Sequence, residues 1–267
     1  MAERSETRTT EPAGTLDPAD FWRGATAIVT GAGQGIGLGI ATALASRGAH
    51  VVLADVNAAE GEKAAASLNG GPGSARFARC DVSVSTEVDR LVAETVADRR
   101  RLDVVVNNAG VVRAAMLWNL TDEQWSTVLN TNLSSMFYMV RAAARAWMMD
   151  HGGAIVNVSS IGGLRGSIGQ INYASAKAGV IGLTKAAALE LGKHGVRVNA
   201  IAPGTTDTPM TKTIMETEKL RERFQKEIPL GRFGTVADIG AAVAFLAGPD
   251  ASWVTGKVLT VDGGAYN

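Results

Sequence analysis

Short apolar runs rich in β-branched residues alternate with longer stretches of helical spacing, and this alternation constrains the fold more than any other feature. Helical spacing is found in residues 35–47, 58–68 and 87–99, each between two apolar runs. Alternation of this period requires right-handed crossovers between parallel strands, with helices over both faces of the sheet. The sequence therefore predicts a doubly wound α/β fold.

Seven apolar runs are predicted to be strands of one parallel sheet. Their lengths fit strands that are covered on both sides. In chain order they read ATAIVTG, HVVLAD, ARFARCDV, LDVVVNNAG, GAIVNVSS, VRVNAIAPG and KVLTVDGG. The chain has 267 residues, which is enough for one such domain, whereas two separate domains would each be small.

Composition argues against several classes of function. The net charge is zero and no block is rich in lysine or arginine, so we expect no nucleic-acid partner. No stretch is long and apolar enough to span a membrane. The single cysteine, Cys80, leaves no internal disulfide and fits the reducing cytoplasm. The three histidines lie far apart in sequence, so no metal-ligand spacing is present.

Two segments are expected to lie outside the regular alternation. Residues 1–22 are polar and lack the apolar core of a signal peptide, so they are predicted to be a flexible arm before one domain over residues 23–267. Residues 205–231 are too long for a simple connection and mix a few apolar residues with many charges. We interpret them as a lid of one or two short helices over a site. The alternative is a surface insertion without a role.

Two helix starts are indicated by their capping residues. Thr121 with Gln124 predicts a capping box for a helix beginning near Asp122. Thr235 with Asp238 predicts the start of a later helix.

The stretch TGAGQGIGLG, which begins at Thr30, places glycine at every second position between the first predicted strand and the first predicted helix. A helix N-terminus offers free N–H groups and a positive dipole end to an anion such as pyrophosphate. The fingerprint G-x-G-x-x-G fits no register here, but the spacing Gly31-x-x-x-Gly35-x-Gly37 is present. We expect Gly31 to permit a tight turn, Gly35 to admit the pyrophosphate and Gly37 to let the helix pack on the sheet.

Further candidate contacts for a dinucleotide follow the next strands. Asp55 ends HVVLAD, twenty residues past Gly35, where a carboxylate can accept hydrogen bonds from both hydroxyls of an adenosine ribose and would repel a 2′-phosphate. Asp81 and Val82 end the third strand and could border the adenine. The amides of NNAG, residues 107–110, could tie strand ends together, and its glycine could admit the cofactor.

Tyr173 and Lys177 are four residues apart, so on a helix their side chains share one face. A tyrosine has a pKa of about 10, and an adjacent ammonium is expected to lower that pKa. The phenol could then exchange a proton with a substrate oxygen while a hydride moves to or from a nicotinamide. Ser160 can hydrogen-bond the same oxygen, and Ser159 is the weaker candidate.

Together these motifs resemble the classical short-chain dehydrogenases/reductases, over roughly residues 25–267. The resemblance implies a single Rossmann-type domain that binds a nicotinamide dinucleotide. It rests on T-G-x-x-x-G-I-G at Thr30–Gly37, N-N-A-G at Asn107–Gly110, Ser160, Y-x-x-x-K at Tyr173–Lys177, P-G at Pro203–Gly204 and V-D-G-G at Val261–Gly264.

The resemblance also implies roles for single residues. Asn132 matches the family's helix asparagine, which holds a water in a proton relay to the lysine, and Asn130 is its nearby competitor. Thr208 matches the threonine that contacts the carboxamide, and Thr206 replaces a usual aliphatic residue whose backbone binds the same group. Lys177 would also hold the nicotinamide ribose. The expected cofactor-binding residues are Gly31, Gln34, Gly35, Ile36, Gly37, Asp55, Asp81, Val82, Asn108, Ala109, Gly110, Tyr173, Lys177, Pro203, Gly204, Thr206 and Thr208.

The substrate contacts are less specific. Ser160 and Tyr173 are expected to contact the reacting oxygen, with Gln170 and Met210 as further contacts. An apolar pocket is indicated by Met116, Trp118, Met210 and Ile214, and one polar contact could come from Arg113, Arg165 or Gln170.

In the family, the helices after the fourth and fifth strands usually form a tetramer interface. Here they correspond to residues 123–149 and 172–193, and the second carries several small residues that allow close packing, within the chain or between chains. The last strand and AFLAG would make a second contact. The resemblance therefore implies a homotetramer.

Three functions are compatible with the sequence. The first is an NAD-dependent enzyme that interconverts a secondary alcohol and a ketone, because Gln34 and Asp55 provide no cation for a 2′-phosphate. The second is an NADPH-dependent ketoreductase resembling 3-oxoacyl-carrier-protein reductases. The IPLGRFG stretch of this chain and its overall length resemble that subgroup. The third is a dinucleotide-binding regulatory protein without turnover, which the fold alone does not exclude.

Overall fold

Seven strands form one parallel sheet in the order β3-β2-β1-β4-β5-β6-β7, in the places that the apolar runs predict. The computed structural model describes residues 17–266. The strands are β1 (Thr26–Thr30), β2 (His50–Asp55), β3 (Ser74–Arg79), β4 (Val104–Asn107), β5 (Gly153–Val158), β6 (Val196–Pro203) and β7 (Val258–Val261).

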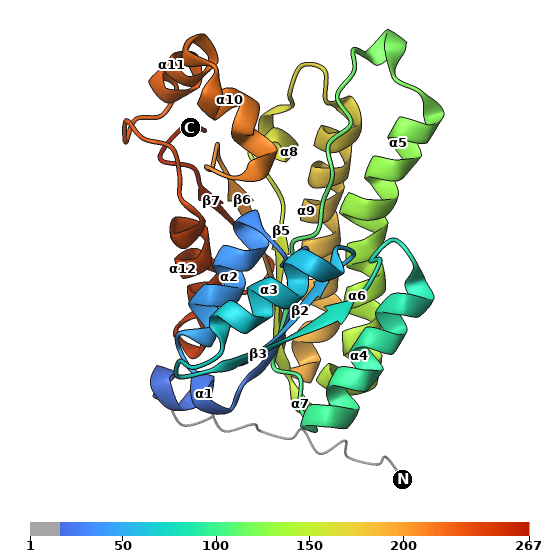
Figure 1. Ribbon diagram of the computed structural model, residues 1–267. Helices are drawn as coiled ribbons and strands as arrows, with labels where there is room; N and C mark the ends of the chain where they lie inside the picture. The colour runs from blue at the N-terminus through green and yellow to red at the C-terminus, as the bar shows by residue number, and fades with distance from the viewer. Residues whose placement is uncertain (1–16, 267) are drawn as a thin grey trace.

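Helices connect the strands and cover the sheet from both sides (Figure 1). The α-helices are α1 (Pro18–Gly24), α2 (Gly35–Ala45), α3 (Ala58–Leu68), α4 (Ser85–Arg99), α5 (Asp122–Leu129), α6 (Ser135–Ala143), α7 (Met149–His151), α8 (Gly162–Arg165), α9 (Ile171–Leu191), α10 (Lys212–Glu216), α11 (Glu218–Lys226) and α12 (Val236–Ala247). Short 3-10 turns are η1 (Leu117–Asn119), η4 (Gly192–His194), η5 (Pro209–Thr211) and η6 (Pro249–Ala251).

Two apolar layers hold these helices against the sheet. Side chains alternate along each strand, so Val29 and Leu53 face one side while Ile28 and Val52 face the other. Helices α2, α3 and α12 pack on the first side, and α4, α6 and α9 pack on the second. The predicted doubly wound α/β fold is confirmed.

The order of the strands reverses between β1 and β4. Strand β1 pairs with β2 on one side and with β4 on the other. Ligands of open α/β sheets bind outside the carboxyl ends of the strands at such a point. The glycine stretch after β1 and the NNAG motif after β4 therefore meet where a ligand site is expected.

Helix α1 corrects the predicted N-terminal arm. Asp17 caps its first turn, and Trp22 is only 4% exposed, in the apolar layer that contains α2 and α12. The prediction of a flexible arm is wrong for residues 17–22, because the indole ring is buried against the domain. The rest of the predicted arm, residues 1–16, lies outside the described residues.

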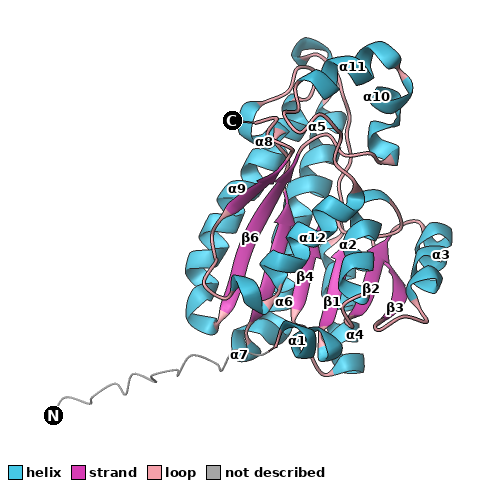
Figure 2. Ribbon diagram, turned by 90° about the vertical axis from the view of Figure 1, so that its left-hand side faces the viewer, coloured by secondary structure: helices cyan, strands magenta, loops and turns pink. Residues whose placement is uncertain are grey.

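The segment interpreted as a lid is largely helical. It contains η5, α10 and α11, which stand above the carboxyl edge of the sheet (Figure 2). Its last residues lie against the C-terminal tail, where the Leu230 N–H donates to the Gly263 carbonyl at 3.1 Å. The segment is thus placed beside the edge at which the predicted site residues gather.

The long helix expected over residues 123–149 is interrupted twice. Two π-helical turns, η2 (Asn130–Ser134) and η3 (Ala144–Met148), separate α5, α6 and α7. Turns of this kind recur at functional sites, and η2 carries Asn132. The predicted capping box at the start of α5 is present, and the predicted start of α12 at Thr235 also carries a capping box.

Candidate active site

The turn after β1 forms a cradle at the N-terminus of α2. Gly31 and Gly35 have φ values of +61° and +57°, a backbone that residues with side chains rarely adopt. No side chain caps the first turn of α2, so its leading N–H groups can bind an anion. These residues fit the pyrophosphate of a dinucleotide.

Two further glycines let α2 approach its neighbours. A methyl group at Gly37 would overlap the Gly31 carbonyl, so the helix packs closely on the strand ends. A methyl group at Gly39 would lie 2.5 Å from Val236 Cβ and 2.8 Å from its carbonyl oxygen. The glycine stretch therefore serves both the anion cradle and the contact of α2 with α12.

Asp55 lies beside the cradle. Its Oδ2 accepts a hydrogen bond from the Gly33 N–H at 3.0 Å, and its Oδ1 accepts one from the Asn57 N–H at 3.0 Å. A carboxylate has about four acceptor positions, so two remain for the hydroxyls of a ribose. Strand register places Arg79 next to Asp55, and Arg79 Nη1 lies 3.7 Å from a carboxylate oxygen of Glu87.

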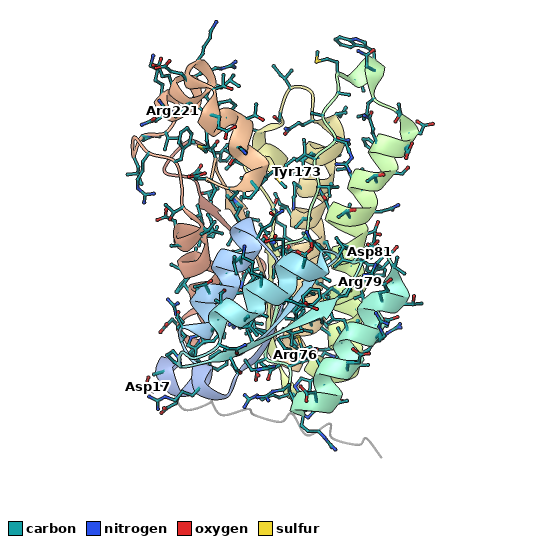
Figure 3. The ribbon with its side chains drawn as sticks, in the orientation of Figure 1. Asp17, Arg76, Arg79, Asp81, Tyr173 and Arg221 are labelled. Atoms are coloured by element: carbon teal, nitrogen blue, oxygen red, sulfur yellow. The ribbon has the colours of Figure 1, made fainter. Side chains whose placement is uncertain are left out.

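Asp81 and Val82 follow β3 at the same edge, where Figure 3 shows Asp81 close to Arg79. The Asp81 carboxylate accepts hydrogen bonds from the N–H and hydroxyl of Ser83. Its own N–H donates to Glu87 Oε2 at 2.9 Å, and Val82 is buried. This network fixes the loop where the adenine is expected.

The NNAG motif joins the ends of three strands. Asn108 Nδ2 donates to the carbonyls of Thr30 and Gly31 at 2.9 and 3.1 Å. Asn107 Nδ2 donates to Asn157 Oδ1 at 2.8 Å, so β4 is tied to β1 and to β5. The Thr30 hydroxyl accepts the N–H groups of Asn108 and Ala109, a role that the sequence interpretation missed although this threonine begins the glycine motif.

Ser160 and Tyr173 border one space near Gly162. A methyl group at Gly162 would lie 3.4 Å from Ser160 Oγ and 3.8 Å from Tyr173 Cε1. The Ser159 hydroxyl is buried and donates instead to the Lys177 carbonyl at 2.8 Å. The geometry therefore favours Ser160 over Ser159 as the partner of Tyr173.

Lys177 is 3% exposed, and its Nζ donates to the Val158 carbonyl at 2.7 Å. Burial disfavours the ammonium and lowers the pKa of Lys177 to about 8. A methyl group at Gly110 would lie 3.7 Å from Lys177 Nζ and 3.3 Å from Asn132 Oδ1. Both side chains thus border the glycine of NNAG.

The expected effect of Lys177 on Tyr173 is wrong for this arrangement. Burial raises the pKa of Tyr173 above its ordinary value, and the hydrogen bond from Ser160 only partly opposes this shift. Lys177 Nζ lies 5.7 Å from the centre of the tyrosine ring and donates to the backbone. Desolvation is therefore the main influence on the pKa of the phenol.

Asn132 is fully buried, whereas Asn130 is exposed. Asn132 Oδ1 accepts the Val111 N–H at 2.8 Å, and its Nδ2 donates to the Val111 carbonyl at 2.9 Å. The π turn thus directs Asn132, and not Asn130, at the loop after β4.

The first residues of the lid segment reach the glycine cradle. Thr208 Cβ lies 3.6 Å from the position of a methyl group at Gly35, and Thr206 is buried two residues after Gly204. The Thr211 hydroxyl donates to the Thr206 carbonyl, which fixes this turn. A cavity of about 370 Å³ lies between these parts; it is lined by Gly35, Leu38, Gly39, Thr42, Asp207, Thr208, Pro209, Val236 and Ala237.

The residues expected to contact substrate are spread along an open edge. Gln170 is partly buried at the start of α9, and Met210 on η5 is 59% exposed. Met116 and Trp118 are 40% and 76% exposed, so the expected apolar pocket is not closed around them. Arg165 lies 3.6 Å from Glu227 at the end of the lid segment.

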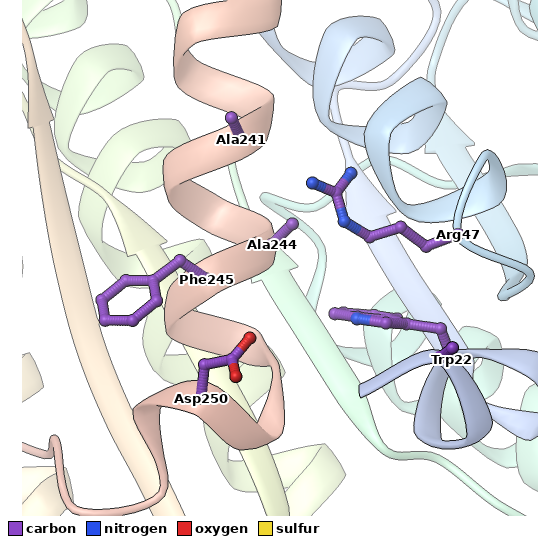
Figure 4. A pocket seen from close by; sticks show the side chains of 7 residues that line it. Trp22, Arg47, Ala241, Ala244, Phe245 and Asp250 are labelled. Carbon is purple, nitrogen blue, oxygen red and sulfur yellow. The ribbon is translucent and has the colours of Figure 1, made fainter. Parts of the chain in front are cut away.

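A separate cavity of about 360 Å³ lies between α1, the end of α2 and α12 (Figure 4). Trp22, Arg47, Phe245 and Asp250 line it together with small residues, and none of them is a predicted site residue. Among residues 17–266, no cluster of histidine, cysteine, aspartate or glutamate could hold a metal ion. None of the helices in that range is both long and apolar enough to cross a membrane.

Known proteins resemble the chain over nearly its whole length. Residues 31–266 match the family model described as enoyl-(acyl carrier protein) reductase. The chain is 47% identical to 3-oxoacyl-[acyl-carrier-protein] reductase FabG of Chlamydia muridarum, over 89% of this chain and 96% of that protein. It is 42% identical to (3R)-3-hydroxyacyl-CoA dehydrogenase of Mus musculus, over 91% and 97%. A crystal structure from Sinorhizobium meliloti 1021, described as a short-chain alcohol dehydrogenase, matches with a TM-score of 0.87 and 36% identity, over 91% and 96%.

Proposed function

Because this chain belongs to the short-chain dehydrogenase/reductase family, we propose that it interconverts 3-oxoacyl and 3-hydroxyacyl thioesters, using NAD(H). The names of both curated relatives specify an acyl substrate with an oxo or hydroxy group at position 3. They support the acyl substrate of the second hypothesis above better than the simple secondary alcohol of the first. Both names are those of enzymes, which weighs against the third hypothesis, a regulatory protein that binds a dinucleotide without turnover.

The observation that carries the reaction is the shared space of Ser160 and Tyr173. When bound, the nicotinamide gives or accepts the hydride. Tyr173 then donates a proton to the carbonyl oxygen in reduction or removes it from the hydroxyl in oxidation. Ser160 hydrogen-bonds that oxygen, and the nearby Lys177 ammonium provides positive charge within the site.

NAD(H) is proposed because of the charges around Asp55. Its carboxylate faces the cradle, and Gln34 at the start of α2 is uncharged. Arg79 is the cation nearest by strand register, and its charge lies beside Glu87. A 2′-phosphate would meet a carboxylate here, at a cost of several kcal/mol at partial burial.

The proposed function is tested by steady-state kinetics with purified protein. We expect reduction of acetoacetyl-CoA or a longer 3-oxoacyl thioester, with much slower reduction of simple ketones and of a 2-enoyl thioester. Efficient turnover of simple ketones alone would contradict the acyl assignment. Reduction of the 2-enoyl thioester in preference to the 3-oxoacyl thioester would contradict the reaction type.

The cofactor is tested in the same assay. We expect kcat/KM with NADH to exceed that with NADPH by at least about a hundredfold, which corresponds to about 2.8 kcal/mol. Asp55→Ala should reduce this ratio of kcat/KM values, and adding Gln34→Arg should reduce it further. Arg79→Ala is the matched control, because it should leave the preference unchanged. Equal use of the two cofactors by the wild type would refute the role of Asp55.

A further inference from the structure

Asn172 directly precedes Tyr173, and neither the sequence motifs nor the proposed reaction gives it a role. Its side chain is fully buried, and its polar atoms all have partners. Asn172 Oδ1 accepts the Tyr173 N–H at 2.8 Å. The first N–H groups of a helix lack partners within the helix, and no side chain at the N-cap position of α9 supplies one. Asn172 thus satisfies the backbone of the proposed catalytic residue.

The amide nitrogen of Asn172 contacts two other elements. Nδ2 donates to the Arg113 carbonyl at 3.0 Å, in the loop after β4, and to the Gln124 carbonyl at 3.3 Å, in α5. The same loop is held by Asn132 at Val111, as described above. A single buried amide therefore connects the start of α9 with the loop that borders the site.

The loop has one further attachment to the same region. The Ala115 N–H donates to the Gly169 carbonyl at 2.9 Å, just before α9. Residues 111–115 are therefore tied to η2 at one end and to the approach of α9 at the other, with Asn172 between them. Loss of Asn172 would leave the Arg113 and Gln124 carbonyl oxygens and the Tyr173 N–H without the hydrogen bonds that Asn172 now provides.

We propose that Asn172 is a positioning residue that holds Tyr173 and the loop of residues 111–115 in one fixed arrangement. The inference rests on the proposed function only in using Tyr173 as the proton donor. A misplaced proton donor lowers turnover much more than it weakens binding of a cofactor whose pyrophosphate the glycine cradle holds. Asn172 itself does not need to touch the substrate.

Asn172→Ala and Asn172→Asp test this role. Alanine removes all three hydrogen bonds, whereas aspartate has the same shape and keeps an acceptor for the Tyr173 N–H. Asn199→Asp is the matched control, since Asn199 is also buried, donates to the Val254 carbonyl and accepts the Lys257 N–H near β7. We measure kcat, KM, the Kd of NADH by fluorescence and the unfolding midpoint of each variant.

We expect Asn172→Ala to lower kcat by at least about tenfold, with KM and the Kd of NADH changed less than about threefold. Asn172→Asp should also lower kcat, because its carboxylate oxygen would face the carbonyls of Arg113 and Gln124. Asn199→Asp should lower the unfolding midpoint and leave kcat unchanged. A wild-type kcat in folded Asn172→Ala would overturn the inference, and if alanine prevents folding, a wild-type kcat in Asn172→Asp would do so.

Hydrogen exchange gives a second readout that needs no substrate. We expect the peptide covering residues 111–115 to lose protection in both Asn172 variants and to keep it in Asn199→Asp. Unchanged protection in the Asn172 variants would contradict the positioning role. Failure of the wild type to reduce 3-oxoacyl thioesters would instead contradict the proposed function, so the two failures can be distinguished.

Discussion

Tyr173 and Lys177 show how burial sets the charge state of a site. Lys177 is buried and Tyr173 is partly buried, so desolvation raises the pKa of the phenol and lowers that of the ammonium to about 8. Near neutral pH the phenol is therefore protonated, and the lysine carries its charge. This state is suited to donating a proton to a carbonyl oxygen, which is the reductive direction of the proposed reaction.

Tyr173→Phe removes the transferable proton and keeps the ring. We expect kcat to fall by about a thousandfold, within the usual range for loss of a general acid. The Kd of NADH, measured by fluorescence, should change little. Tyr138→Phe on α6 is the control and should keep wild-type turnover. A near-normal kcat for Tyr173→Phe would show that another group donates the proton.

The pH dependence should follow Lys177. Because its pKa is lowered to about 8, the ammonium is present below that pH and is lost as the pH rises through it. We expect kcat/KM for 3-oxoacyl reduction to be level below about pH 8 and to fall above it. A profile from about pH 6 to pH 10 checks this. A decline beginning only near pH 10 would mean that Lys177 keeps its ordinary pKa during the reaction.

At the scale of elements, the contact between α2 and α12 determines where the glycine cradle lies. Gly39 and Gly240 allow the two helices to approach, since a methyl group at Gly240 would lie 2.7 Å from the Gly39 carbonyl. Val236, which Gly39 contacts, also lines the cavity beside Thr208. The anion cradle and the start of the lid segment therefore share one close helix pair.

Gly39→Ala should destabilise the protein by about 1–3 kcal/mol, because its methyl group would overlap Val236 in a packed contact. Gly192→Ala is the control. Gly192 has helical φ and ψ values, and nothing lies within 4 Å of the position of an added methyl group. That substitution should be neutral or slightly stabilising. Denaturant unfolding gives the free energy of unfolding of both variants. Equal values for the two variants would contradict the close contact between Gly39 and Val236.

For the whole molecule, exposed apolar side chains support the expected homotetramer. Trp125 on α5, Phe137 on α6 and Leu189 on α9 are 40%, 48% and 85% exposed. Near β7 and α12, Trp253 and Phe245 are 98% and 45% exposed. Exposed apolar side chains of this kind occur at protein interfaces. We therefore propose that α5, α6 and α9 form one interface, and that α12 and β7 form another.

Light scattering at micromolar concentration should give the mass of a tetramer. Gly182 on α9 is exposed, and a methyl group there would meet nothing within 4 Å in the chain, so Gly182→Arg should leave the fold intact and lower the mass. Ala66→Arg, at an exposed position of α3, should keep the wild-type mass. A monomeric wild type, or an unchanged mass for Gly182→Arg, would contradict the α9 interface.

Most of the strands and helices and the main motifs could be predicted from the sequence. Strands and helices follow from local periodicity, and the turn at Gly31 and Gly35 follows from backbone conformations open mainly to glycine. The spacing of Tyr173 and Lys177 fixes their common helix face. These features depend on neighbours in sequence, so they can be deduced before the fold is known.

Which polar groups are buried and what they contact could be seen only in the folded chain. It distinguished Asn132 from Asn130, buried Trp22 in a segment predicted to be flexible and gave Asn172 its three partners. It also reversed the expected shift of the Tyr173 pKa. Desolvation and long-range hydrogen bonds depend on groups brought together from distant parts of the chain. Local sequence patterns do not predict those contacts.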